Sequence, residues 1–121
     1  FKLGTLYYRK DRNKTIKSKL KKRIIKKNMG WCDDVKSKKY NKLIKTTIKI
    51  RYEKMFRRDY KYDYLITINY NTKNTKLGKG SAIFIHLTKN YKKTLGCIAL
   101  KKNDFLILLR LIKKNTKIRI S

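Results

Sequence analysis

Residues 81–87 limit the fold of this chain more than any other segment, because Ser-Ala-Ile-Phe-Ile-His-Leu is almost entirely apolar. A short run that is apolar at consecutive positions is typical of a buried strand. Residues 64–70, Tyr-Leu-Ile-Thr-Ile-Asn-Tyr, form a second strand candidate because β-branched and aromatic residues dominate them. Together the two segments predict a β-rich fold with a hydrophobic core.

Three shorter segments are also predicted to be strands. Thr46–Ile50 and Thr116–Ile120 alternate β-branched and polar residues, and Gly96–Leu100 is short and apolar. Asn71–Asn74 and Leu77–Gly80 favour turns, because Asn and Gly adopt turn conformations easily.

One helix is predicted near the C-terminal end of the chain. Asn103 or Asp104 is suited to cap its start, and Lys113 and Lys114 suit the negative end of its dipole. Its apolar positions recur at the helical period. They are Phe105, Leu106, Leu108, Leu109 and Ile112.

The remaining segments and the length complete the predicted fold. Lys14–Lys27 is very basic and is expected to be a solvated helix or a surface loop, and Met29–Asp34 is expected to be a loop. A length of 121 residues suits a single domain, residues 1–121. The pattern predicts a mainly β fold, a sandwich or barrel-like structure with one C-terminal helix, rather than a helical bundle.

Several classes of protein are excluded. No apolar run approaches the roughly 18 residues of a membrane span, since the longest, Phe105–Ile112, is interrupted by Arg110. Two cysteines are too few for a disulfide scaffold. The chain begins at Phe1 and shows no signal peptide, so targeting signals do not indicate a compartment.

The net charge of +29 raises the possibility of a basic nucleic-acid-binding module. The balance of 28 Lys to 8 Arg argues against it, because Arg is the preferred bidentate partner of phosphate and guanine. The charge is also spread along the whole chain, and no recognised nucleic-acid motif is present. Lys, Ile, Asn and Tyr have A/T-rich codons and make up 61 of the 121 residues, so composition alone explains much of the charge.

The residues with chemical potential are the only histidine, His86, and Cys97, which follows Gly96. A cysteine nucleophile needs a base within hydrogen-bond reach, and backbone N–H groups near it can stabilise an oxyanion. By themselves, one cysteine and one histidine are more typical of a packed core than of a catalytic pair. Cys32 is expected to be packed rather than paired with Cys97. A zinc site of Cys32, Cys97 and His86 is not expected, because it lacks a fourth ligand and a close-set pair.

The surroundings of these two residues resemble a known family. Ser81-Ala-Ile-Phe-Ile-His86, followed by Thr94-Leu-Gly-Cys97-Ile-Ala-Leu, resembles the signature of the L,D-transpeptidase catalytic domain, the YkuD-like family. The resemblance is to the stand-alone bacterial branch and covers about residues 1–120. Further matches in the same order are Tyr8–Arg12, Gly30–Asp34, Tyr40-Asn41, Glu53 with Met55, Arg58-Asp59 and Tyr62-Asp63.

This resemblance implies a β-rich sandwich and acyl transfer on peptidoglycan stem peptides. Cys97 would attack the carbonyl of the diamino acid at position three, and the thioester would pass to an amine of another stem to give a 3–3 cross-link. His86 would move the proton and be oriented by a backbone carbonyl. Gly96 would supply an oxyanion N–H together with Cys97, and Thr94 would order the loop.

The resemblance also implies no cofactor, a location in the cell envelope or periplasm, and a monomer with no specific nucleic-acid partner. Trp31, Asp33 and Ser81 are expected to contact substrate. The chain departs from many members at Leu95 and Ala99, which affects substrate contacts more than the nucleophile. Family domains have further strands before a segment like Phe1-Lys2-Leu3, so we expect a shortened N-terminal side and an exposed sheet edge.

Three alternatives remain open at this point. An L,D-carboxypeptidase would use the same site with water as acceptor. A nucleic-acid-binding module would bind polyanions with steep salt dependence and without any role for Cys97 or His86. A catalytically inactive wall-binding domain would result if the shortened side disrupted the sheet.

Overall fold

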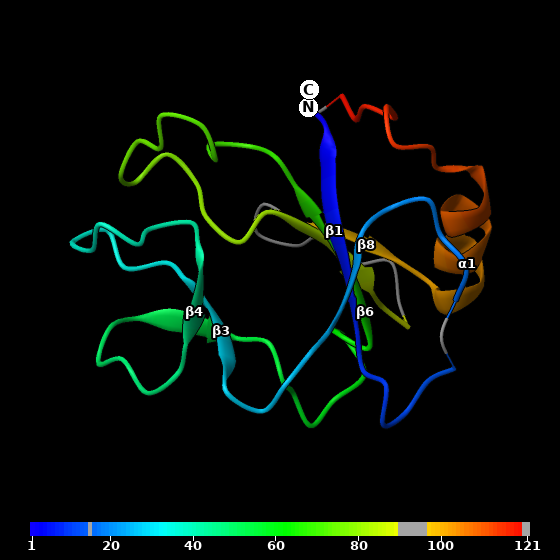
Figure 1. Cartoon of the computed structure of the whole chain (residues 1–121), viewed down its shortest axis with the longest axis horizontal. Helices are drawn as coiled ribbons and strands as arrows, with labels where there is room; N and C mark the ends of the chain where they lie inside the picture. The colour runs from blue at the N-terminus through cyan, green and yellow to red at the C-terminus, as the bar shows by residue number, and fades with distance from the viewer. Residues whose placement is uncertain (15, 90–96, 120–121) are drawn as a thin grey trace.

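The computed structural model of the chain describes residues 1–14, 16–89 and 97–119. In this part of the chain eight strands form two sheets, accompanied by one helix (Figure 1). The larger sheet has the strand order β2-β1-β6-β7-β8, and the smaller has the order β4-β3-β5. The elements are β1 Leu3–Tyr8, β2 Lys22–Ile24, β3 Met29–Cys32, β4 Leu43–Lys45, β5 Tyr52–Lys54, β6 Tyr64–Ile68, β7 Phe84–Leu87, β8 Ile98–Leu100 and α1 Lys102–Leu111.

The larger sheet mixes strand directions. Its three middle strands run antiparallel, β1 to β6 and β6 to β7, whereas the edge strands β2 and β8 run parallel to β1 and β7. The smaller sheet is antiparallel throughout. The prediction of a mainly β fold with one C-terminal helix is therefore confirmed.

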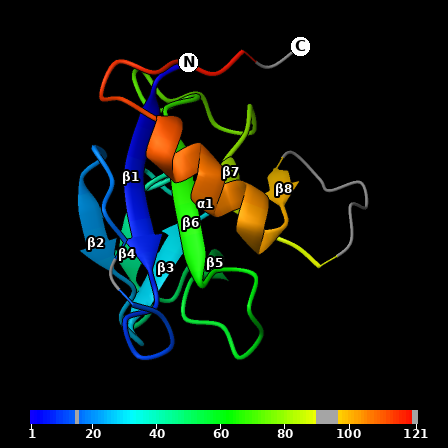
Figure 2. The same ribbon diagram turned by 90° about the vertical axis from the view of Figure 1, so that its right-hand side faces the viewer.

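Both faces of the larger sheet are covered, which explains why its middle strands are apolar at consecutive positions. Helix α1 lies across one face, in front of β1 and β6 in Figure 2. The smaller sheet and its loops cover the other face through Met29 and Met55, which pack on Leu65 and Phe84. The α1 side of the core includes Leu6, Ile66, Ile85, Leu87, Phe105, Leu109 and Ile112.

Helix α1 begins differently from the prediction. Its N-cap residue is Lys101, without a side-chain capping bond, and the expected caps Asn103 and Asp104 lie inside the first turn. Asp104 there still suits the positive end of the helix dipole. The apolar face is as predicted, because Phe105 and Leu109 are buried on the sheet.

The strands expected from apolar runs are confirmed, although they are shorter than the runs. β6 and β8 lie inside the predicted segments, and β7 begins only at Phe84. One reason is Ala82, whose φ of 55° breaks the extended conformation before β7.

Two local expectations are wrong. Met29–Asp34, expected as a loop, contains β3, because Met29 and Cys32 are drawn into the core. Gly30 suits this strand, since the ring of Tyr52 lies 2.7 Å from where a Cβ would stand. Thr46–Ile50, expected as a strand, is a run of turns and bends, and none of its residues is buried to reward the β propensity.

Three further segments, one near the C-terminus and two in the first 27 residues, also differ from expectation. In the basic segment Lys14–Lys27, the described residues form β2 and irregular structure but no helix. Thr116–Ile120 shows a single bridge, Lys2 to Lys117, among its described residues. Strand β1, which the sequence analysis did not anticipate, lies inside the sheet between β2 and β6.

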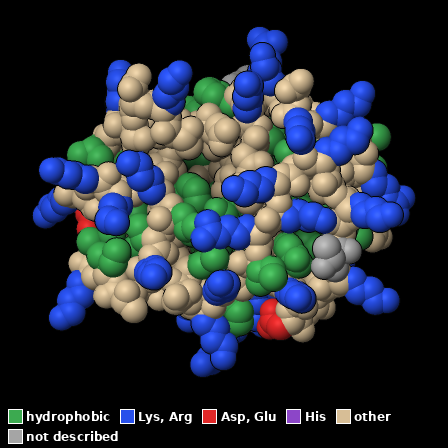
Figure 3. All heavy atoms as spheres, viewed as in Figure 1, with side chains coloured by type: hydrophobic (Ala, Val, Ile, Leu, Met, Phe, Trp, Pro, Cys, Tyr) green, Lys and Arg blue, Asp and Glu red, His purple; other side chains and the backbone are tan. Residues whose placement is uncertain are grey.

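The basic side chains do not gather in one stripe. On the face shown in Figure 3, Lys and Arg project from nearly every part of the surface, with few acidic groups between them. The distribution follows the sequence, in which Lys and Arg occur along the whole chain.

The stability of the fold should depend strongly on the α1 side of the core. Phe105 is fully buried, so Phe105→Ala is expected to lower the free energy of unfolding by about 3–5 kcal/mol. Ile107 on the same helix is 54% exposed, and Ile107→Ala should change the free energy of unfolding by no more than about 0.5 kcal/mol. Urea unfolding followed by circular dichroism measures both. Equal losses in the two variants would contradict this account of the helix.

Candidate active site

Strand β7 positions His86. Along a strand, side chains alternate between faces, so Ile85 and Leu87 face α1, whereas Phe84 and His86 face the smaller sheet. His86 is buried, and its Nδ1 lies 2.9 Å from the carbonyl oxygen of Leu87. A carbonyl only accepts, so in the neutral ring Nδ1 carries the proton and Nε2 keeps the lone pair. His86 is thus arranged as a base through Nε2.

Cys97 lies immediately before β8, the strand that pairs with β7. Ile98 is in register with Ile85 and Ala99 with His86, which places Cys97 beside Phe84. Its thiol is half-buried, and Sγ lies 3.2 Å from the carbonyl oxygen of Ala82. It packs against the cluster that holds Phe84 on the side of the smaller sheet.

Tyr62 contacts His86, lies in the cluster on which Cys97 packs, and is hydrogen-bonded to Glu53. Its ring meets the ring of His86 edge-on, with centroids 5.6 Å apart, and belongs to the same cluster as Cys97. Its hydroxyl donates to Glu53 Oε1 at 3.0 Å. Burial, and then the charges of Glu53 and Cys97, raise the pKa of Tyr62 well above its usual value. His86 and Cys97 therefore share one face of the sheet around Tyr62.

The surroundings favour the neutral forms of both reactive groups. Burial raises the pKa of Cys97, with Glu53 adding to the rise and a backbone hydrogen bond from Phe84 opposing it. Burial lowers the pKa of His86, helped by Lys61 and Arg57, while the Leu87 carbonyl and Glu53 oppose it. These shifts favour a neutral thiol and a neutral imidazole over a thiolate and imidazolium pair.

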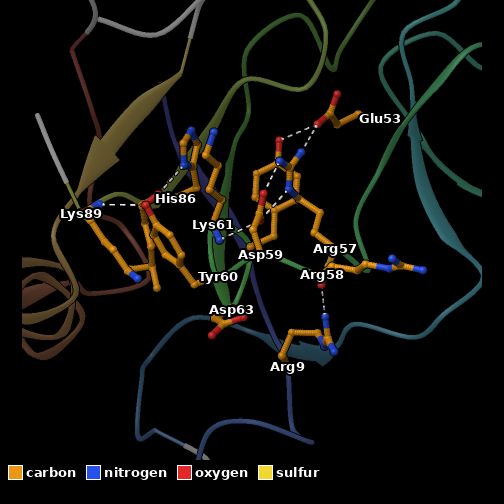
Figure 4. Close-up of polar contacts among 12 residues, drawn as sticks. Arg9, Glu53, Arg57, Arg58, Asp59, Tyr60, Lys61, Asp63, His86 and Lys89 are labelled. Atoms are coloured by element: carbon orange, nitrogen blue, oxygen red, sulfur yellow. Dashed lines mark hydrogen bonds and ion pairs between the residues drawn. The ribbon is translucent and has the colours of Figure 1, made fainter. Parts of the chain in front are cut away.

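A charged network of Arg57, Asp59 and Glu53 lies near His86 (Figure 4). Arg57 binds Asp59 through two parallel bonds, of 2.9 Å from Nε and 2.6 Å from Nη2. Its Nη1 also contacts Glu53 at 3.3 Å. The guanidinium, through its hydrogen bonds, is the main cause that lowers the pKa of Asp59.

Two arginines from the turn after β1 hold the loop that carries this network. Arg9 is buried, stacks on Phe56 at 3.5 Å from the ring centroid, and donates to the carbonyl of Arg57 at 2.6 Å. Arg12 donates to the carbonyls of Asp59 and Arg58 at 2.7 and 2.8 Å. Asp11 receives two bonds from Arg9, which fixes the guanidinium. The loop is therefore tied to the larger sheet.

The other residues expected to contact substrate have structural contacts. Trp31 meets Phe84 edge-on at 5.4 Å, and its Nε1 donates to Asn41 Oδ1 at 2.9 Å. Ser81 Oγ donates to the carbonyl of Cys32 at 2.6 Å, which joins the start of β7 to β3. Asp33 lies 3.7 Å from Arg51. Of these side chains, Trp31 is the one that packs on the cluster containing Cys97.

The remaining expectations concern the loop before Cys97, the second cysteine, a metal site and a membrane span. Thr94, Leu95 and Gly96 lie outside the described residues. Cys32 is fully buried, and both cysteines are present as thiols. Within residues 1–14, 16–89 and 97–119, no group of His, Cys, Asp and Glu is arranged to hold a metal ion. No helix in that part of the chain is long and apolar enough to cross a membrane.

Comparison with known proteins settles the family. The family model of the L,D-transpeptidase catalytic domain, YkuD, matches residues 5–120. The chain belongs to this family. An L,D-transpeptidase domain has L,D-transpeptidase-type catalytic function, and its family acts on peptidoglycan and is typically associated with the cell wall. No curated protein and no solved structure matches the chain.

Sequence reasoning missed the surroundings of the reactive pair in this L,D-transpeptidase domain. From the sequence, no chemical role is assigned to Tyr62, Glu53 or Arg57. The segments containing Glu53 and Tyr62 were among those that resemble the family, and this was the available signal. A contact between two strands and a loop is not visible in local patterns.

The guanidinium of Arg9 should be needed for stability, not only its charge. Arg9→Lys keeps the charge but loses the parallel bonds to Asp11 and the stacking on Phe56, so the midpoint of thermal unfolding should fall. Arg110→Lys makes the same exchange at an exposed position of α1 and should leave the midpoint unchanged. Calorimetry compares the two. An equal midpoint in both variants would show that the bonds of Arg9 to Asp11 and its stacking on Phe56 do not stabilise the fold.

Proposed function

We propose that this domain is a cysteine-dependent acyltransferase on peptidoglycan stem peptides that forms 3–3 cross-links through a thioester on Cys97. The observation that supports it most is that His86 on β7 and Cys97, immediately before the paired strand β8, lie on one face of the sheet, within a chain of the L,D-transpeptidase family.

In the proposed acylation step, Cys97 attacks the carbonyl of the diamino acid at position three of a tetrapeptide. His86 Nε2 takes the thiol proton as the C–S bond forms, which is possible because Nδ1–H is held by the Leu87 carbonyl. The imidazolium then protonates the nitrogen of the departing D-Ala, and the C–N bond breaks. The enzyme is left as a thioester with a neutral imidazole.

In the transfer step, an amine of a second stem attacks the thioester carbonyl. His86 accepts a proton from the attacking nitrogen and returns it to the sulfur as the C–S bond breaks. The products are a 3–3 amide and the free thiol. With water in place of the amine, the same steps describe an L,D-carboxypeptidase, so the acceptor alone distinguishes the two activities.

The remaining roles are proposed from the family resemblance. The backbone N–H groups of Gly96 and Cys97 would stabilise the oxyanion, and the Thr94 hydroxyl would order their loop. Trp31 would line the groove near Cys97, consistent with its packing beside Phe84. Asp33 and Ser81 would border it more remotely, since Asp33 contacts Arg51 and Ser81 donates to the carbonyl of Cys32. The proposed location is the cell envelope, in the periplasm, where stem peptides are exposed.

The nucleophile can be tested with a carbapenem, which acylates an active-site thiol by opening of its β-lactam ring. Intact mass should show one adduct on the wild-type protein, and peptide mapping should place it on Cys97. Cys97→Ala should abolish the adduct, whereas Cys32→Ser should retain it, because Cys32 is buried away from solvent. Persistence of the same adduct in Cys97→Ala would overturn the mechanism.

The pH profile of acylation should reflect a neutral imidazole. Because burial lowers the pKa of His86, the base form persists below the usual value of 6.5. The acid limb of the acylation rate should therefore be centred below pH 6.5, at the lowered pKa of His86. Stopped-flow or quenched mass spectrometry with the carbapenem at pH 4.5–8 measures this. An acid limb centred above 6.5 would contradict the assignment of His86 as a buried neutral base.

A further inference from the structure

Glu53 is the acidic side chain that Tyr62 connects to His86 and Cys97, the proposed reactive pair. It lies on β5 directly opposite Trp31 of β3, so both side chains share the face of the smaller sheet that meets Phe84. The Glu53 side chain is 34% exposed. Glu53 therefore lies on the same side of the smaller sheet as the cluster on which Cys97 packs, and it remains partly open to solvent.

The hydrogen bonds of Glu53 leave one oxygen available. Tyr62 and Arg57 both donate to Oε1, at 3.0 and 3.3 Å. Within the described residues no hydrogen bond to Oε2 is formed. Arg57 is already bound by Asp59 through two shorter bonds, so it compensates the charge of Glu53 only in part. The carboxylate can accept from one further donor.

The charge of Glu53 acts on both reacting groups. It contributes to raising the pKa of Cys97, and it opposes the lowering of the pKa of His86. Tyr62 links Glu53 to this pair, because its hydroxyl donates to Glu53, its ring contacts that of His86, and it lies in the cluster on which Cys97 packs. A cation bound at Glu53 would therefore lie on the Tyr62 side of the proposed thioester.

The other acidic residues are engaged elsewhere. The chain carries 36 basic residues and 7 acidic ones, so its surface repels a cationic amine. Asp104 lies on α1, across the larger sheet from the site. The other five have partners of their own: Asp11 with Arg9, Asp33 with Arg51, Asp59 with Arg57, Asp63 with Arg12, and Asp34 with the backbone N–H groups of Lys36 and Arg51.

We propose that Glu53 binds the ammonium group of the acyl acceptor and so directs the thioester to an amine rather than to water. This inference rests on the proposed thioester at Cys97. The ammonium docks on Oε2 and loses one proton to solvent, and the resulting amine attacks the carbonyl. His86 takes the second proton from nitrogen and delivers it to Sγ as the C–S bond breaks. The balance is thioester plus amine to amide plus thiol.

The test measures how the thioester divides between two acceptors. The probe is a stem tetrapeptide with a diamino acid at position three, supplied as both donor and acceptor at pH 7, and mass spectrometry quantifies cross-linked dimer against hydrolysed tripeptide. Glu53→Gln keeps the hydrogen-bonding shape for Tyr62 and Arg57 but removes the charge. The dimer-to-tripeptide ratio should fall about tenfold or more, as expected for loss of one charge-assisted hydrogen bond. The rate of carbapenem adduct formation on Cys97 should change by less than about threefold, since acylation needs no amine.

Matched controls separate binding of the amine from general effects. Asp104→Asn removes the same charge from α1 and should leave the ratio unchanged. Glu53→Asp should recover part of it. Hydroxylamine, a nucleophile that is neutral at pH 7, should capture the thioester equally well in the wild type and in Glu53→Gln. If the variants fold poorly, salt provides the readout on the wild type, because 0.5 M NaCl should lower the share of peptide amine but not of hydroxylamine.

Each outcome decides the proposal. An unchanged ratio in Glu53→Gln, or a parallel loss of peptide amine and hydroxylamine capture, overturns it. A wild-type enzyme that yields tripeptide alone overturns it as well, although Cys97 would still form an adduct. Absence of the adduct in the wild type instead refutes the thioester mechanism itself, so the two failures are distinguishable.

Discussion

Burial of the larger sheet on both faces is the constraint on which the rest of this structure depends. Strand β7 is buried at all four positions, so each of its side chains must face either α1 or the smaller sheet. The alternation that sends Ile85 and Leu87 to the helix sends Phe84 and His86 to the other layer. Parallel pairing with β8 then brings Cys97 to that same side. The reactive pair is thus a consequence of how the core is closed.

The low polarity of this layer determines the chemistry that the pair can perform. Burial favours a neutral thiol and a neutral imidazole, so in the proposed mechanism the proton moves during the attack and not before it. The acids around the site are tied to arginines, and Arg9 and Arg12 attach their loop to the turn after β1. Ala82, held at a φ of 55°, shows that the segment before β7 also carries backbone strain where its carbonyl accepts from the Cys97 thiol. Positioning and burial, rather than permanent charge, prepare the site.

Local patterns predicted the elements whose residues are buried on a regular period. β6, β7, β8 and the apolar face of α1 were predicted, because burial imposes periods of two or about 3.6 residues on the sequence. β3 was missed, because Gly30 and the adjacent Asp pair suggest a turn, while contacts with distant residues hold Met29 and Cys32 in a strand. Thr46–Ile50 has strand propensity but no neighbour that buries it, and so it turns.

By itself, the sequence determined a β-rich fold with a C-terminal helix, and it singled out Cys97 and His86 through their rarity and through motifs that resemble one family. These are properties of residues near each other in the chain. The tertiary structure decided that the Leu87 carbonyl holds His86, that Tyr62 lies against His86, and that Glu53 accepts from the Tyr62 hydroxyl. Such contacts join β5, β7 and a loop separated by tens of residues, and only the packing of the two sheets brings them together.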